Sequence, residues 1–298
     1  MKIAATSYVL DMASGHPAAA ETASGNVVTF ETMDCFSNCI VRPDQPFSSV
    51  GWDKINPATG PLFVTEAVPG DILKVEVLDI RVAARGVMTT APGFGALGKE
   101  MTREVTKIVP VENGKAVIND RVSLPINPMI GVIGVAPAGE AVPTGTPGEH
   151  GGNMDCKRIV KGAVLYLPVN VPGALLAMGD LHAVMGDGEI VVCGVEIPGE
   201  IDVRVSVLKN VELPTPFLIE KDSLMTIASA KTLDEAAVEA TRKMHRFLQE
   251  RLGLENHEAG MLLSAAADLR ICQIVDPLMT ARMEFPAELA KLYAFKAD

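Results

Sequence analysis

The chain has 298 residues, 48% of them hydrophobic, which is enough apolar material for a large buried core. Its 26 basic and 37 acidic residues give a formal net charge of -11, which argues against nucleic acid or an anionic membrane surface as a partner. The five cysteines show no short disulfide spacing, and we find neither an apolar signal core nor a run of about 18 apolar residues. We therefore expect an acidic globular protein of the reducing cytoplasm.

Strand patterns fill the first part of the chain. Residues 27–32 are rich in strand-forming types, and residues 73–80 alternate apolar and polar side chains, as a half-buried strand does. The Asn, Pro and Gly cluster at 56–61 indicates a turn between them. The Gly-x-Gly-x-x-Gly at 93–98 lacks a preceding hydrophobic strand and a following helix, so we interpret 84–100 as a mobile loop near a ligand site.

The middle of the chain also predicts β structure. Apolar runs at 130–136, 163–169 and 174–178 indicate buried strands. Segments 189–196 and 201–208 flank a Pro-Gly-Glu turn and predict a β-hairpin. Regular strands separated by Pro-Gly turns are typical of a sandwich or barrel.

Helices are expected only near the C-terminus. Thr232 and Glu235 form a capping box, apolar residues follow at helical spacing, and Gly253 provides a stop signal. A second helix is predicted over about 258–266, and residues 269–277 return to strand.

These patterns together predict a mainly β fold. We expect a β-sandwich or barrel-like core with a smaller C-terminal helical (α+β) part. Because no linker separates domains cleanly, residues 1–298 are expected to form one unit. Two intimately packed subdomains with a boundary near 140–150 are the alternative.

Two glycine-rich polar segments, 147–155 and 179–189, carry most of the residue types that suggest chemistry. In extended backbone the side chains of Asp180 and His182 point to the same side, so one metal ion could bind both. Two further pairs repeat this spacing: Asn153 with Asp155, and Asp187 with Glu189. Turn formation explains one such pair, but three pairs within about 40 residues favour a site. Unpaired carboxylates there would repel one another, and a divalent cation removes that cost.

Cysteine chemistry is an alternative. Cys35 and Cys39 have no second pair that would complete a structural zinc site. Cys193 lies in an apolar run and is expected to be a core residue, whereas Cys156 directly follows Asp155 and stays a candidate thiol nucleophile.

Several long motifs follow one another along the chain: Phe-Glu-Thr-x-Asp-Cys at 30–35, Asn-Pro-Ala-Thr-Gly-Pro at 56–61, Pro-Gly-Asp at 69–71, Gly-Val-Ala-Pro at 134–137, His-Gly-Gly-Asn-Met-Asp at 150–155, Leu-Tyr-Leu-Pro-Val at 165–169, Gly-Asp-x-His at 179–182, Gly-Asp-Gly-Glu at 186–189 and Asp-Leu-Arg-x-x-Gln-x-x-Asp-Pro at 268–277. In this order they resemble the acetamidase/formamidase family of amide hydrolases. The resemblance implies a mainly β fold, an associated zinc or calcium ion, and hydrolysis of small carboxamides to carboxylate and ammonia. It leaves the substrate open, lactams included.

On this basis we predict the roles of individual residues. The predicted metal ligands are Asp180 and His182, with Asp155 and Asp34 as additional ligands. The predicted catalytic residues are Glu189 as general base, Glu31 and His150 in reserve for that role, and Asn153 with the Gly151 and Gly152 N–H groups as oxyanion donors. A divalent metal lowers the pKa of a bound water to about 7 and polarises the carbonyl, and a histidine ligand favours zinc over calcium.

Other readings stay open. The acidic turns could hold a structural calcium or zinc ion in a non-catalytic β protein, or Cys156 could serve a cysteine-dependent amidase. Trp52 and the loop at 84–101 are the expected specificity elements. The expected partners are a small amide substrate and, because edge strands favour pairing, a second copy in a homo-oligomer (a dimer).

Overall fold

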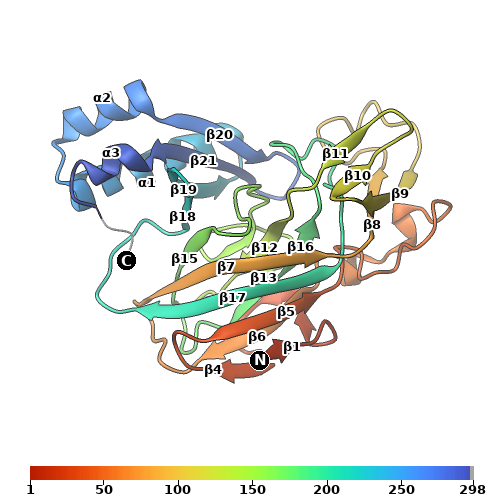
Figure 1. Cartoon of the computed structure of the whole chain (residues 1–298), viewed down its shortest axis with the longest axis horizontal. Helices are drawn as coiled ribbons and strands as arrows, with labels where there is room; N and C mark the ends of the chain where they lie inside the picture. The colour runs from red at the N-terminus through yellow and green to blue at the C-terminus, as the bar shows by residue number, and fades with distance from the viewer. Residues whose placement is uncertain (296–298) are drawn as a thin grey trace.

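The computed structural model describes residues 1–295 and shows a mainly β protein with a C-terminal helical part, as predicted (Figure 1). Its large sheet has nine strands in the order β1-β5-β17-β7-β15-β18-β19-β21-β20. Their bounds are β1 Lys2–Ile3, β5 Val27–Thr32, β17 Gly199–Leu208, β7 Ile72–Val82, β15 Val164–Pro168, β18 Phe217–Glu220, β19 Ser223–Ala230, β21 Met279–Pro286 and β20 Asp268–Gln273. Most neighbours are antiparallel, and β1 pairs parallel with β5.

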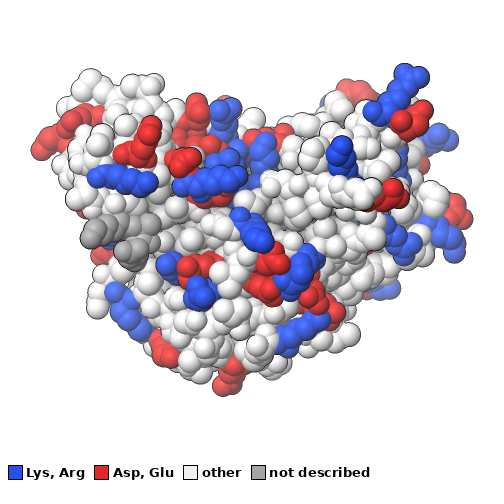
Figure 2. Space-filling view, viewed as in Figure 1, with Lys and Arg blue, Asp and Glu red and all other residues white. Residues whose placement is uncertain are grey.

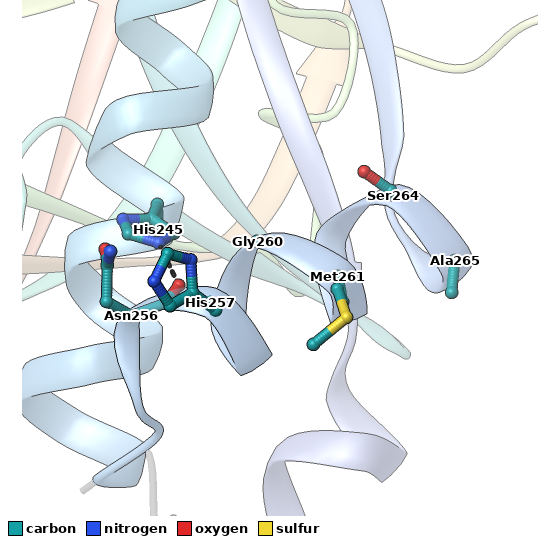
Figure 3. A pocket seen from close by; sticks show the side chains of 7 residues that line it. All are labelled: His245, Asn256, His257, Gly260, Met261, Ser264 and Ala265. Atoms are coloured by element: carbon teal, nitrogen blue, oxygen red, sulfur yellow. Dashed lines mark hydrogen bonds between the residues drawn. The ribbon is translucent and has the colours of Figure 1, made fainter.

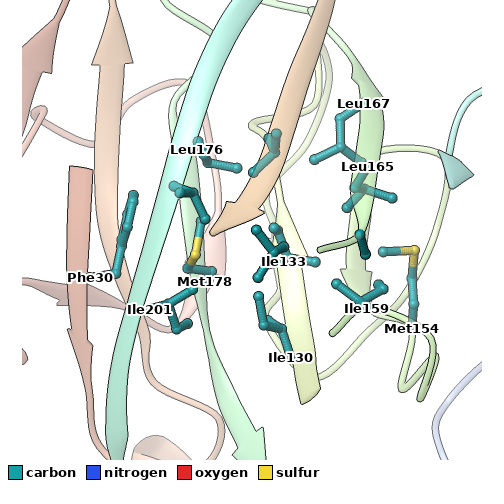
Figure 4. Close-up of a cluster of buried hydrophobic side chains, with 14 of the residues drawn as sticks. Phe30, Ile130, Ile133, Met154, Ile159, Leu165, Leu167, Leu176, Met178 and Ile201 are labelled. Atoms are coloured by element: carbon teal, nitrogen blue, oxygen red, sulfur yellow. The ribbon is translucent and has the colours of Figure 1, made fainter. Parts of the chain in front are cut away.

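A second sheet supplies the strands that end at the polar segments. Its order is β14-β12-β16-β6-β2, and β4 also pairs with β6. The bounds are β14 Gly151–Asn153, β12 Met129–Gly134, β16 Leu176–His182, β6 Ala58–Val64, β2 Tyr8–Val9 and β4 Ala20–Thr22. Side chains of both sheets, among them Phe30, Ile133 and Met178, form one buried core (Figure 4). Residues of β12 and β16 belong to this core, which holds the two strands in place.

Smaller elements complete the β part. A four-stranded sheet contains β8 Arg85–Thr90, β9 Val105–Glu112, β10 Lys115–Val117 and β11 Ser123–Pro125. The short strands β3 Asp11–Met12 and β13 Val142–Pro143 pair with each other, and two 3₁₀ turns, η1 and η2, span Phe47–Ser49 and Trp52–Lys54. Figure 1 shows the four-stranded sheet and the helices at opposite ends of the molecule.

The helices cover one end of the large sheet beside β18–β21 (Figure 1). Helix α1 spans Leu233–Leu252, α2 spans Asn256–Ala266 and α3 spans Ala287–Lys291. The capping box of Thr232 with Glu235 is present, and Gly253 ends α1 in the left-handed conformation, so both predicted signals are confirmed. Among residues 1–295, no helix combines the length and the apolar character that a membrane crossing requires.

The solvent face of the large sheet is polar. Arg81 on β7 forms ion pairs with Asp202 at 2.5 Å and Glu200 at 3.0 Å, both on β17. Figure 2 shows basic and acidic side chains interspersed on this face. The sheet here therefore buries one face and exposes the other, as the alternation at 73–80 predicts.

Two segments differ from the prediction. The hairpin arm at 189–196 is not a strand, because Glu189 and Val192 adopt left-handed backbone angles with φ of 49° and 80°. The segment turns back, and Glu196 exchanges backbone hydrogen bonds with Val87 at 2.7 and 2.9 Å instead. The predicted loop at 84–100 contains a strand, β8, before its glycine-rich part.

Candidate active site

A cavity of about 540 Å³ opens where the two polar segments meet the 35–56 region. Its floor carries Asn153, Asp180, Glu189, Glu196 and Asp276. Its walls are largely apolar and include four aromatic side chains: Phe36, Phe47, Trp52 and Phe94. Convergent acids beneath apolar walls are the expected arrangement of a small-molecule site.

The second sheet delivers the central residues to this floor. Asp180 and His182 lie at the C-terminal end of strand β16, and Asp155 follows β14, which pairs with β12. Asp155 and Asp180 hold φ angles of 42° and 55°, as does Glu189 at 49°. Left-handed backbone is costly for such residues, and it concentrates at functional sites. Asp180 itself has left-handed backbone, so the fully extended backbone expected from the sequence is not present. The carboxylate of Asp180 nevertheless lies 3.5 Å from His182 Nε2.

Four carboxylates surround the buried imidazole of His182. Its Nε2 lies 3.0 Å from Glu196 Oε1, 3.5 Å from Asp180 Oδ1, and 3.8 Å from both Asp155 Oδ1 and Glu189 Oε1. Within residues 1–295, Nε2 of His182, both Asp155 oxygens and Glu196 Oε2 are buried without a hydrogen-bond partner. Buried polar atoms are rarely left without a hydrogen bond, so these atoms are expected to bind a ligand or an ion.

Burial and like charge raise the pKa values of Asp155, Glu189 and Glu196. Burial, reinforced by the charge of Asp180, raises the pKa of Asp155 to about 7. Burial likewise raises the pKa of Glu196 to about 8, although the nearby His182 opposes this rise. The pKa of Glu189 is well above its usual range because the side chain is buried beside Asp155. Burial alone would lower the pKa of His182, but the charges of Glu196 and Asp180 raise it well above 6.5.

The donor set fits a divalent metal ion. Two groups have ligand atoms within 4.8 Å of one another: Asp155, His182 and Glu189, and Cys35, Asp180 and Glu196. Gly131 on β12 makes their approach possible. A Cβ at this position would lie 2.5 Å from Asp155 Oδ1 and 2.6 Å from Asp180 Oδ2. Imidazole, thiolate and carboxylate ligands together suit zinc, and the carboxylates alone suit calcium.

Asn153 and Asp276 form the side of the floor next to Asp155. Asn153 Nδ2 donates to Asp276 Oδ2 at 2.9 Å, while Asn153 Oδ1 is buried without a partner among the described residues. Gln273 shapes the Asp276 turn, because its Oε1 accepts hydrogen bonds from the backbone N–H groups of Val275 and Asp276 at 2.8 and 3.0 Å. The Gln-x-x-Asp-Pro motif therefore builds one wall of the site.

Several predicted site residues lie elsewhere. Glu31 points to the surface of β5 and pairs with Lys2 at 3.3 Å, so it is not in the cavity. His150 is buried but does not line the cavity, and burial lowers its pKa to about 4. Gly151 N–H donates to the backbone oxygen of Gly148 at 3.1 Å within its own turn, which removes it as an oxyanion donor.

Two predicted acidic residues are engaged in other contacts. Asp34 is buried near the cluster, and its Oδ1 accepts hydrogen bonds from the N–H groups of Phe36 at 3.0 Å and Asn38 at 2.7 Å. Burial raises the pKa of Asp34 to about 6 against these two hydrogen bonds. Asp187 turns away from Glu189 and pairs with Arg282 at 2.7 Å, because the left-handed Glu189 breaks the two-residue period.

Sequence reasoning did not select Glu196, Asp276 or Cys35 as site residues. Glu196 fell inside the predicted strand at 189–196, where it counted as its last residue. Asp276 belongs to the motif at 268–277, and this motif was the signal that could have identified it as a site residue. Cys35 follows Asp34 in another motif and lines the cavity.

A larger depression of about 650 Å³ lies between α1 and α2, but its chemistry is weaker (Figure 3). His245 and His257 face it, and Nε2 of His245 is hydrogen-bonded to the Asn256 backbone oxygen at 2.9 Å. It is an open surface groove, and none of the described residues that line it is acidic. The buried cluster is therefore the candidate active site.

Known proteins are similar to this chain over most of its length. The model of the "Acetamidase/Formamidase family" matches residues 14–143 and 138–291. A crystal structure of an acetamidase from Bacillus halodurans superposes with a TM-score of 0.98 at 48% identity, covering 99% of this chain and 100% of the other. A predicted acetamidase/formamidase from Thermoanaerobacter tengcongensis gives a TM-score of 0.97 at 41% identity, covering 99% and 98%.

Curated relatives match over shorter regions. An acetamidase from Mycolicibacterium smegmatis is 37% identical over 136 residues, which is 42% of this chain and 32% of that protein. The matches to curated relatives span less than two thirds of those proteins' length. The family model and the structures nevertheless cover most of this chain, and the chain belongs to the acetamidase/formamidase family.

Proposed function

We propose that this protein hydrolyses small linear carboxamides to carboxylate and ammonia with the help of a divalent metal ion. The buried imidazole of His182 lies close to four carboxylates, and its Nε2, both Asp155 oxygens and Glu196 Oε2 lack a hydrogen-bond partner among residues 1–295; this observation carries the proposal. Formamidases and acetamidases among the similar proteins support the choice of reaction.

His182, Asp155 and Asp180 are the proposed metal ligands, and Glu196 with Cys35 completes the donor set around them. When bound, a divalent ion acidifies a coordinated water and polarises the amide carbonyl. The imidazole and the thiol favour zinc among the candidate metals.

Glu189 is the proposed general base. It lines the cavity and lies beside Asp155, and burial raises its pKa, which makes its carboxylate a stronger base than that of an exposed glutamate. Its carboxylate takes the proton of the attacking water and delivers it to the leaving nitrogen. Asn153 Nδ2 has a second N–H besides the one given to Asp276, and this N–H can donate to the substrate oxygen.

The test is ammonia release from a panel of small amides, with and without a chelator, together with the metal content of each protein. We expect His182→Ala to lose both metal and activity, and Glu189→Gln to keep the metal but lose most of the rate. His245→Ala, on the surface of α1, is the matched control and should change neither. Full amidase activity of metal-stripped His182→Ala would refute the metal mechanism.

A thiol mechanism has less support from the geometry. Cys156 is fully buried in the hydrophobic core and does not line the cavity. Cys35 does line it, but burial raises its pKa well above 9.0, which disfavours the nucleophilic thiolate. Alkylation that abolishes activity while the metal stays bound would favour a cysteine nucleophile instead.

A further inference from the structure

The mouth of the cavity is built from aromatic rings. Phe47 contacts Trp52 and Phe94 edge to face at ring-centroid distances of 5.7 and 5.5 Å, and Trp52 lies 5.8 Å from Phe94. Phe36 packs edge to face on Phe47 at 6.0 Å. These rings form a continuous apolar wall above the acidic floor.

Trp52 is 68% exposed at this mouth. A large aromatic side chain left in water beside other rings marks a surface that gains from being covered. The same cavity is lined by Trp52 and by the acidic residues of the floor. A ligand that covers the Trp52 ring can therefore also reach the floor.

The aromatic wall is joined to the segment that carries the proposed base. Ala96 N–H donates to the Ile190 backbone oxygen at 2.9 Å, directly after Glu189 in the chain. A Cβ on Gly95 would lie 2.6 Å from that same oxygen, so glycine is needed for this approach. Phe94 is thereby held in a fixed position relative to Glu189.

The size of the cavity exceeds what formamide or acetamide fills. Its volume of about 540 Å³ falls within the range of roughly 300–1,000 Å³ that holds much larger ligands. At roughly 30 Å³ per water, the space equals about 18 water molecules. A small amide bound at the floor would leave the aromatic wall facing water.

The charge of the cavity limits the substrate further. Of the described residues that line it, none is Lys or Arg, whereas Asp180, Glu189, Glu196 and Asp276 are acidic. A substrate that carries a carboxylate or phosphate would meet no cation on the wall. The acidic lining therefore disfavours an anionic acyl group, and the aromatic rings of the wall favour an apolar one.

We infer that the preferred substrate is a neutral primary amide with an aromatic or bulky apolar acyl group, whose ring packs against Trp52 and Phe94. This inference rests on the proposed amide hydrolysis for its reaction, but not for its binding mode. The aromatic wall selects the acyl group, and the acidic floor receives the carboxamide.

The kinetic test compares acetamide, phenylacetamide and the anionic amide succinamate with the metal-loaded full chain. We expect kcat/KM for phenylacetamide to exceed that for acetamide by at least about tenfold, with succinamate poorest. Trp52→Ala should lower the value for phenylacetamide about tenfold and change that for acetamide by less than about twofold, while Trp52→Phe retains the preference. Met261→Ala, at 67% exposure on α2, is the matched control and should change neither.

A binding test separates this inference from the proposed reaction. Trp52 is the only tryptophan of the chain, so its fluorescence reports directly on the mouth of the cavity. Phenylacetamide should shift this emission saturably, acetamide and succinamate should not, and Phe94→Ala should weaken the response about tenfold. An unchanged emission, equal or better hydrolysis of acetamide, or an equal loss for both amides in Trp52→Ala would overturn the inference. If the wild-type protein hydrolyses no amide, the proposed reaction fails, and the fluorescence titration still decides the substrate class.

Discussion

Glu196→Gln offers the sharpest test of the electrostatics of the buried cluster. The substitution keeps the shape of the side chain but removes an ionisable carboxyl group 3.0 Å from His182 Nε2. In the metal-free protein the pKa of Glu196 is raised from 4.5 to about 8. The folded state therefore holds a proton that the unfolded state has already released, and the stability this gives is lost as pH rises.

The magnitude follows from these two pKa values. A carboxyl group at 4.5 in the unfolded state and about 8 in the folded state lowers the free energy of unfolding by about 3 kcal/mol between pH 5 and pH 8. The raised pKa values of Asp155 and His182 act in the same direction. The free energy of unfolding of metal-free wild-type protein should thus fall markedly as pH rises from 5 to 8. In Glu196→Gln it should fall by less.

The assay is denaturant unfolding in the presence of a chelator at several pH values from 5 to 8. Glu220→Gln is the control, because this buried carboxylate is paired with Arg158 at 2.7 Å outside the cluster. It should lower stability without removing the fall with pH. Added zinc should reverse the fall in wild-type protein, since binding to the folded state alone gives about 2.7 kcal/mol at a hundredfold excess over Kd. An identical fall in wild-type and Glu196→Gln protein would refute the reasoning.

Three further variants test separate parts of the structure. Gly131→Ala places a methyl group 2.5 Å from Asp155 Oδ1 and 2.6 Å from Asp180 Oδ2, so zinc affinity measured by competition with a chelator should fall at least about tenfold; unchanged affinity would contradict this geometry. His150→Gln removes a buried imidazole whose pKa is lowered from 6.5 to about 4. As pH falls from 7 to 5, the free energy of unfolding of wild-type protein should drop by about 2 kcal/mol more than that of the variant; an equal drop in both would show that His150 does not cause it. Thr232→Ala removes the N-cap of α1 and should lower the free energy of unfolding by about 1 kcal/mol in thermal or chemical unfolding, with amidase activity unchanged.

Local signals predicted the elements whose causes are local. The capping box at Thr232 and the stop at Gly253 fix both ends of α1, because the groups they satisfy lie within the same helix. The strand at 27–32 matches β5, since its alternation alone decides which side chains are buried. The same alternation buries Phe30 and so directs Glu31 to the surface. The motif at 30–35 suggested Glu31 as a site residue because a motif does not show which face of a strand a side chain occupies.

Long-range contacts explain what the sequence could not predict. Residues 189–196 have strand composition, but the left-handed Glu189 and Val192 turn the chain so that Glu196 faces His182. No periodic pattern encodes such a turn, because its cost is offset only by tertiary contacts. Asp276 reaches the floor from the far end of the chain, so only its motif could indicate it.

The same contacts make the proposed metal part of the fold as well as of the chemistry. Asp155, Asp180 and Glu189 each adopt backbone angles that cost roughly 1–3 kcal/mol, and their carboxylates are buried close together. Apolar packing does not offset like charges that are brought together without hydrogen bonds. Protonation offsets them at low pH, and a divalent cation does so at neutral pH. The clustered carboxylates of the floor are therefore stabilised either by bound protons or by a bound metal ion. Only the metal-bound form leaves Glu189 deprotonated and able to act as a base.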